Sequence, residues 1–113
     1  MKYVLFFFTI VLILSSGSYK DRVQAFLADK DVSPQIIIVS ENVYCDGQMA
    51  LGCTSVYPLK IGSLGVNLTI MKIADDTHRK VCSFCISFDQ TLIHEFNHVL
   101  QYSKEGVMYE SEN

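Results

Sequence analysis

Two histidines with a glutamate beside the first are the residues of this sequence best suited to chemistry. His94, Glu95 and His98 form the string His-Glu-x-x-His. On a helix, side chains at positions i and i+4 lie one above the other, so both imidazoles can bind one metal ion. A pair of neutral imidazoles at this spacing on a helix suits zinc. The spacing therefore predicts a zinc site, held by His94 and His98.

Glu95 is predicted to act on water rather than to bind the metal. It is turned about 100° around the helix from His94, so it can reach a water beside the ion without being a ligand. Zinc lowers the pKa of such a water toward neutrality, and a carboxylate can then act as the general base and pass the proton to a leaving amine. The alternative is a helix that carries two histidines by chance.

The helix expected to carry the motif has a defined beginning, a defined end and one apolar face. Ser87 followed three residues later by Gln90 fits a capping box, and Asp89 places a negative charge in the first turn. Gly106 is a natural stop. Apolar residues recur at helical spacing between them: Leu92, Ile93, Phe96, Val99 and Leu100.

Two shorter elements are predicted in the first part of the chain. Val23, Phe26 and Leu27 lie on one helical face of residues 20–29, which predicts a short amphipathic helix. Residues 35–40 are mostly β-branched and predict a buried strand.

The middle of the chain is predicted to form a loop region and two strands. Residues 42–59 are rich in turn formers and two cysteines, which predicts a loop pinned by disulfides. Residues 65–73 alternate and predict a half-buried strand, and residues 80–86 predict a short one. The order of elements predicts an α+β fold, with a short mixed sheet packed on the motif helix.

The first eighteen residues have the three parts of a secretory signal. Met1 and Lys2 form a short basic start, residues 4–14 are almost wholly apolar, and residues 15–18 are small. An apolar helix of that length covers only about half of the ~30 Å hydrocarbon core, which makes a transmembrane anchor the weaker alternative. We predict a signal peptide at residues 1–18 and a secreted domain at residues 19–113 with no stable membrane anchor.

The four cysteines are expected to be oxidised in that compartment. Cys45, Cys53, Cys82 and Cys85 allow three pairings, and the sequence leaves all three open. A zinc half-site at Cys82 and Cys85 is an alternative, but Cys45 and Cys53 are spaced too widely to complete it. A redox Cys-x-x-Cys is another, although no βαβ pattern surrounds it.

Composition argues against several classes of protein. Nine Lys and Arg face twelve Asp and Glu, and the net charge of −3 gives no footprint for nucleic acid. The 50% hydrophobic and 19% charged fractions argue against disorder. The length of 113 residues indicates one small domain, which we expect to be a monomer. Asn67-Leu-Thr is a glycosylation sequon.

Around the motif, the sequence resembles the zincin metallopeptidases. The segment Thr91-Leu-Ile-His-Glu-Phe-Asn-His98 is similar to the T-L-x-H-E-x-x-H of the deuterolysin type, the aspzincins. Residues 82–88, Cys-Ser-Phe-Cys-Ile-Ser-Phe, are similar to their C-P-x-F-F stretch, and Cys45 and Cys53 fall in a comparable earlier loop. The resemblance implies a small zincin-like fold and a secreted zinc metallopeptidase that hydrolyses peptide bonds.

The resemblance also implies a third zinc ligand after the helix. Aspzincins supply an Asp from a G-T-x-D-x-x-Y-G segment, whereas residues 104–113 contain no Asp. Glu110 is the carboxylate best placed to replace it, ahead of Glu105 and Glu112. The alternative is that all three belong to a solvated acidic tail.

Two further roles are implied by the resemblance. Zincins hold a peptide or protein substrate in extended form against an edge strand, and residues 66–73 are the strand expected to do this. Tyr109 matches the Tyr of the late aspzincin segment and would donate to the transition-state oxyanion. Tyr102 is a second candidate, for which packing is the favoured role.

Other zincin branches fit less well. Metzincins continue the motif with a Gly and a third His, where this chain has Gln101 and Lys104. His78 lies in a polar segment and is expected to be a surface residue. The competing functional class is a non-catalytic, disulfide-stapled secreted protein, such as an effector, an inhibitor or a truncated or decayed peptidase, because so small a domain leaves little room for a substrate cleft.

Overall fold

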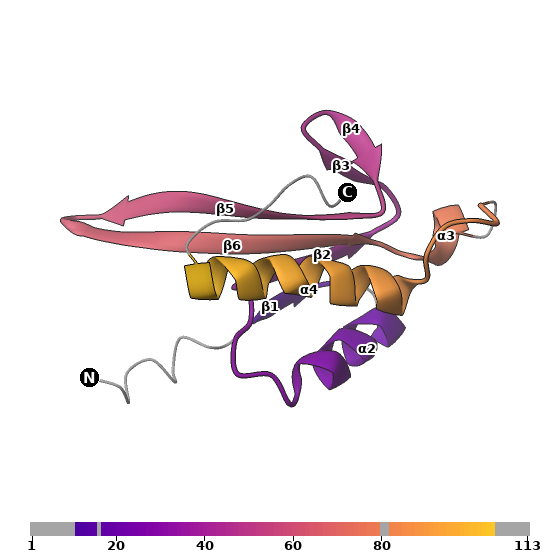
Figure 1. Cartoon of the computed structure of the whole chain (residues 1–113), viewed down its shortest axis with the longest axis horizontal. Helices are drawn as coiled ribbons and strands as arrows, with labels where there is room; N and C mark the ends of the chain where they lie inside the picture. Colours follow the sequence, from indigo (N-terminus) through magenta and orange to yellow (C-terminus); the bar gives the residue numbers. More distant parts are fainter. Residues whose placement is uncertain (1–10, 16, 80–81, 106–113) are drawn as a thin grey trace.

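The computed structural model describes residues 11–15, 17–79 and 82–105 of the chain. The fold is α+β, as the order of elements predicts (Figure 1). In chain order the elements are β1 (Leu12–Leu14), α2 (Gly17–Leu27), β2 (Ile36–Ser40), β3 (Val43–Cys45), β4 (Gln48–Ala50), β5 (Gly52–Ile61), β6 (Leu64–Ala74), α3 (Asp76–Arg79) and α4 (Phe88–Glu105).

The described strands form one mixed sheet and one separate hairpin. The sheet has the order β1-β2-β6-β5, and β3 and β4 form the hairpin. Strands β1, β2 and β6 are parallel to one another, whereas β5 runs antiparallel to β6 over its whole length. The tight connection between β5 and β6 uses Gly62 at a φ of +64°, a conformation that glycine adopts without steric cost.

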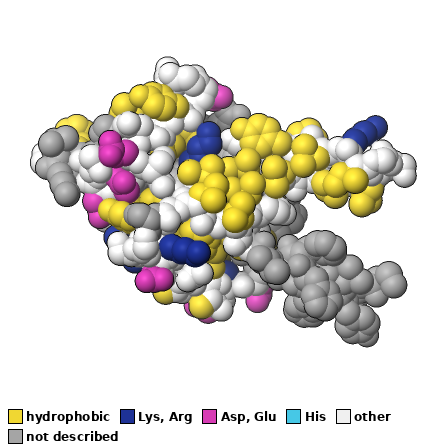
Figure 2. Space-filling view, turned by 180° about the vertical axis from the view of Figure 1, so that it is seen from behind, with side chains coloured by type: hydrophobic (Ala, Val, Ile, Leu, Met, Phe, Trp, Pro, Cys, Tyr) yellow, Lys and Arg dark blue, Asp and Glu magenta, His cyan; other side chains and the backbone are white. Residues whose placement is uncertain are grey.

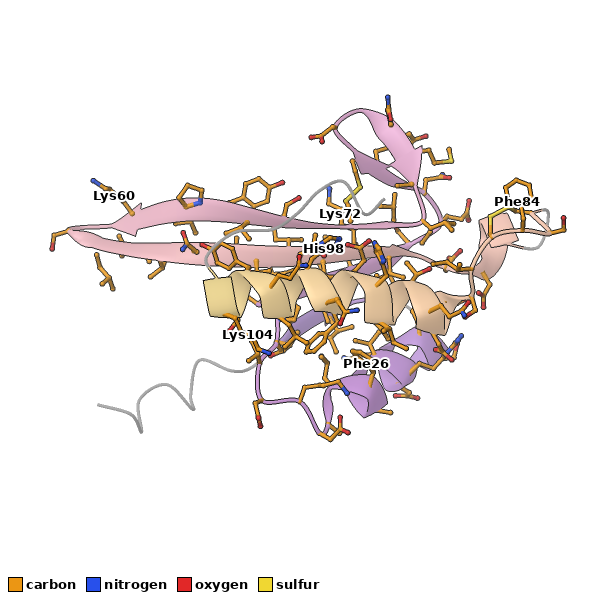
Figure 3. The ribbon with its side chains drawn as sticks, viewed as in Figure 1. Phe26, Lys60, Lys72, Phe84, His98 and Lys104 are labelled. Carbon is orange, nitrogen blue, oxygen red and sulfur yellow. A yellow bond between two sulfur atoms is a disulfide. The ribbon has the colours of Figure 1, made fainter. Side chains whose placement is uncertain are left out.

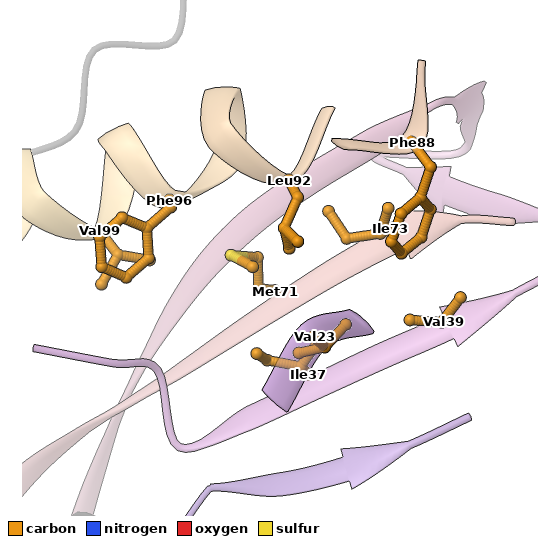
Figure 4. Close-up of a cluster of buried hydrophobic side chains, with 9 residues drawn as sticks. All are labelled: Val23, Ile37, Val39, Met71, Ile73, Phe88, Leu92, Phe96 and Val99. Carbon is orange, nitrogen blue, oxygen red and sulfur yellow. The ribbon is translucent and has the colours of Figure 1, made fainter. Parts of the chain in front are cut away.

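Helices α2 and α4 cover the same face of this sheet. Alternate residues of a strand point to one face, and Ile37 and Val39 of β2 face the helices together with Met71 and Ile73 of β6. Figure 4 shows the resulting core between the sheet and the two helices. Its buried members are Val23, Ile37, Val39, Met71, Ile73, Phe88, Leu92, Phe96 and Val99.

The predicted capping box forms at the start of α4. The backbone N–H of Gln90 donates to Oγ of Ser87 at 3.1 Å, and the backbone N–H of Ser87 donates to Oε1 of Gln90 at 3.1 Å. Each bond satisfies a donor that a helix end otherwise leaves without a partner. The helix predicted to begin here is therefore confirmed, and so are the helix and strand predicted at residues 20–29 and 35–40, with shifted ends.

Three predictions about the middle of the chain need correction. Residues 42–59 are not a loop, because they form β3, β4 and most of β5. Residues 82–86 contain no strand, because a disulfide closes them into a turn. Residues 66–73 do lie in a strand, but β6 is flanked by β2 and β5, so the described sheet has β5 as its edge on that side.

All four cysteines are paired, as expected of an oxidising compartment. The disulfides are Cys45–Cys53 and Cys82–Cys85. The first joins β3 to β5, and the second lies just before α4. Of the three pairings left open by the sequence, the fold selects the one with the shortest loops.

The predicted signal segment overlaps the first two described elements. Strand β1 pairs with β2, and α2 begins at Gly17, so cleavage after residue 18 would remove β1 and leave α2 from Tyr19 onward. The Tyr19 hydroxyl bonds to Asp76 and its ring packs on Phe88, contacts that a mature chain would keep. Within the described ranges, no helix is long and apolar enough to cross a membrane.

Candidate functional site

Helix α4 lies against the sheet and brings the motif next to strand β5. Gly52, the first residue of β5, lies directly against α4. A Cβ on Gly52 would stand only 2.8 Å from Cγ2 of Thr91 and 3.0 Å from Cγ of Glu95. A side chain at this position would therefore push β5 away from the helix, and glycine is what allows the approach.

The two histidines of the motif lie together, as their spacing predicts. Their ring centroids are 5.1 Å apart, with the ring planes at 87°. His94 is half-buried, whereas His98 is buried under the sheet, with 5% of its surface exposed (Figure 3). The helix thus holds one partly exposed imidazole, His94, and one buried imidazole, His98.

The ring nitrogens of His98 have unequal surroundings. Nδ1 lies 3.4 Å from Oε1 of Gln101, one turn further along α4. Nε2 is buried and has no hydrogen-bond partner in the part of the chain that the structure describes. With a proton on Nδ1 facing Gln101, the lone pair is on Nε2, which is the state in which an imidazole binds a metal ion.

An unpartnered buried nitrogen is costly, and a metal ion would remove that cost. Leaving such a group unsatisfied costs about 1–3 kcal/mol. The imidazoles of His94 and His98 fit zinc, because histidine nitrogens are among its preferred ligands. The described residues contain no cluster of three His, Cys, Asp or Glu side chains placed to hold a metal.

Glu95 is buried between α4 and the start of β5. Only 2% of its surface is exposed, and the Thr54 hydroxyl lies 2.8 Å from its Oε1 and 3.2 Å from its backbone oxygen. Burial raises the pKa of the Glu95 carboxyl, while the bond from Thr54 and the charges of His98 and His94 lower it. Because burial dominates, Glu95 holds a proton more readily than an exposed glutamate does.

A cavity of about 760 Å³ opens beside the motif. Its walls come from the β3–β4 hairpin, the first residues of β5, Ile86 and the start of α4. His94 and Glu95 both line it, together with the Cys45–Cys53 disulfide. The motif therefore borders a space large enough for a side chain of a bound peptide.

The structure brings together only part of the predicted site. His94, Glu95 and His98 share one region, as expected. Glu110 and Tyr109 lie outside the described residues. Tyr102 accepts a hydrogen bond from the Asn67 amide of β6, which ties the helix to the sheet.

Sequence reasoning missed the residues that β5 contributes. Gly52 and Thr54 lie in a segment predicted as a loop, so neither stood out. The only local hint in the sequence was Gly52 beside Cys53, because a glycine can mark a place where another element comes close. Gln101 was noted for replacing a metzincin glycine, but not for its place beside His98.

Comparisons of the chain with protein-family models, with curated proteins and with solved structures find no match. Any functional proposal therefore depends on the residues and geometry of the site itself.

Proposed function

We propose that this protein is a secreted zinc metallopeptidase of the zincin type, which hydrolyses peptide bonds. The observation that carries the proposal is the buried Nε2 of His98, which has no hydrogen-bond partner among the described residues and lies beside His94. Glu95 is held on the same helix, at the wall of an open cavity. A helix with two chance histidines would not be expected to bury one without a partner.

In this proposal, His94 and His98 hold the ion and Glu95 handles the proton. Bound zinc would make a water molecule more acidic and polarise the peptide carbonyl. Glu95 takes the proton of the attacking water and delivers it to the leaving amine. Its raised pKa suits the second step, because more of the carboxyl then holds a proton that it can donate near neutral pH.

Strand β5 is the element best placed to bind the substrate. It is the edge of the described sheet on the side of the motif, and its Thr54 contacts Glu95. An extended peptide can add to such an edge through main-chain hydrogen bonds. This role passes to β5 from residues 66–73, which are flanked by strands on both sides.

The remaining parts of the site are assigned from the resemblance alone. Glu110 is proposed as the third zinc ligand and Tyr109 as the oxyanion donor. Both follow Gly106, beyond the end of α4.

A second candidate is the non-catalytic secreted protein. One observation favours it: the described part of the site supplies two imidazoles and no third ligand. A protein of this kind would keep the fold and the disulfides without turning over a substrate.

Zinc content tests the binding part of the proposal. Purified residues 19–113, refolded with their disulfides and given zinc before gel filtration, should retain about one zinc per chain. His94→Ala and His98→Ala should each abolish retention. Asn97→Ala is the matched control, since Asn97 is an exposed position inside the same motif and should leave zinc unchanged. A folded wild-type protein that retains no zinc would exclude the metal site.

Turnover tests the catalytic part. Glu95→Gln should keep zinc but lower peptide hydrolysis about 10²–10⁴-fold, the usual loss for a missing general base. Glu110→Ala should instead lower zinc occupancy, and excess zinc should partly restore the rate. Equal inactivity of zinc-loaded wild type and Glu95→Gln across a peptide library would favour the non-catalytic candidate.

A further inference from the structure

The hairpin of β5 and β6 extends beyond the end of α4 (Figure 1), and one of its faces is exposed as far as the described residues go. Residues directly opposite each other in an antiparallel pair point to the same face. On the face turned away from the helices, the register places three apolar pairs in succession: Tyr57 with Leu68, Leu59 with Val66, and Ile61 with Leu64. These six residues are called here the apolar stripe.

The apolar stripe is solvent-exposed along most of its length. The exposed fractions are 45% for Tyr57, 43% for Leu59, 66% for Ile61, 62% for Leu64 and 37% for Val66. Figure 2 shows hydrophobic side chains continuing along the projecting hairpin. Scattered exposed hydrophobics are normal, but a continuous row of this kind is characteristic of an interaction surface.

The opposite face of the hairpin has a different character. The residues between those of the stripe include Pro58, Lys60, Gly65 and Asn67. Near the body this face is covered by α4, where Asn67 donates to Tyr102. The hairpin is therefore amphipathic, and the described part of the chain provides no partner on the side of the stripe.

We infer that the apolar stripe is a self-association surface, through which two copies of this chain pack face to face. The stripe has no charged member, so the same surface can meet itself without repulsion, as a two-fold interface requires. Lys60 is on the other face and would stay in water. Two sheet faces can pack in this way with their apolar side chains interdigitating.

The size of the stripe sets the strength of the pairing. Its side chains expose on the order of 450 Å² per copy, similar to the largest patch on a typical monomer. Two copies, with neighbouring backbone, would bury roughly 1,000–1,200 Å², at the lower limit of specific interfaces. The dimer should therefore be weak and form in the micromolar range, in contrast to the monomer expected from the sequence.

A lipid surface suits the stripe less well than a second copy does. Membrane binding through an apolar strip is usually supported by several cations near the surface. Here Lys60 is the only charged residue from Val56 to Leu68, and the whole chain has a net charge of −3. A second copy makes no such demand.

Sedimentation of the purified full chain at roughly 1–300 µM tests the inference, because an interface of this size dissociates in that range. The wild type should change from monomer to dimer as concentration rises. Ile61→Thr with Leu64→Thr, which places a strand-favouring β-branched residue at both positions, should weaken association at least tenfold. Lys60→Thr, next to Ile61 but on the opposite face, is the matched control and should have no effect on association.

Three outcomes would overturn the inference. These are a wild type that remains monomeric at the highest concentration, a control that weakens association as much as the double variant, and monomers that co-sediment with phosphatidylcholine vesicles through the stripe. The wild-type measurement needs no variant, so the test survives if a variant fails to fold. Zinc content is independent of this surface, so failure here leaves the proposed function unaffected.

Discussion

Helix α4 has two buried faces of opposite chemistry. One face carries Leu92, Phe96 and Val99 against β2, β6 and α2. The other carries Thr91, Glu95 and His98 on the side that meets β5. Members of both faces are at most 5% exposed, so burial alone does not distinguish them.

The difference between the faces lies in what burial does to the free energy of unfolding. Burying hydrocarbon stabilises the fold by about 25 cal/mol per Å² removed from water. Burying a carboxylate and an imidazole costs free energy unless their hydrogen bonds are replaced. The apolar face is thus where α4 gains its stability, and the polar face adds little to the free energy of unfolding.

Truncating the apolar face should have the largest effect. Phe96→Ala removes a buried ring that packs edge-on against the ring of Phe26, with the ring centroids 5.3 Å apart. The substitution leaves a cavity in the core. We expect the free energy of unfolding to fall by about 3–5 kcal/mol, measured by urea denaturation. Ile93→Ala, on the half-exposed side of the same helix, is the control and should cost far less. Similar losses for the two variants would contradict the picture of a one-sided core.

Removing the hydrogen bond to the polar face should have an intermediate effect. Thr54→Val keeps the size of the side chain but deprives Glu95 of its hydroxyl partner. The free energy of unfolding of the metal-free protein should fall by about 1–3 kcal/mol, the cost of an unsatisfied buried group. Ser55→Ala, the next residue of β5 on the opposite face, should stay near wild type. No change with Thr54→Val would mean that the bond contributes nothing to stability.

Neutralising the polar face should have the smallest effect on stability. Glu95→Gln keeps an oxygen that accepts from Thr54 and removes a charge that burial disfavours. In metal-free protein near neutral pH, we expect the free energy of unfolding to stay within about 1 kcal/mol of wild type. The comparison would fail if this variant unfolded as easily as Phe96→Ala, because Glu95 would then be a structural residue.

Elements with a clear local pattern were predicted well, strands β2 and β6 among them, whereas β3, β4 and β5 were missed. The start of α4 follows from Ser87 and Gln90, whose side chains bond to the backbone within one turn. Strand β5 was missed because Gly52 and Pro58 are typical of turns. Pro58 is tolerated there because an edge strand has backbone positions that need no donor.

The face of α4 that holds His94, Glu95 and His98 was determined by the sequence alone, because positions i and i+4 of a helix meet whatever surrounds them. What lies opposite that face was decided by the tertiary structure. The bond of Thr54 to Glu95, the edge position of β5 and the one-sided apolar stripe all depend on the register between β5 and β6. A shift of one residue in that register would turn every side chain of β5 to the other face, and no local pattern in this segment determines it.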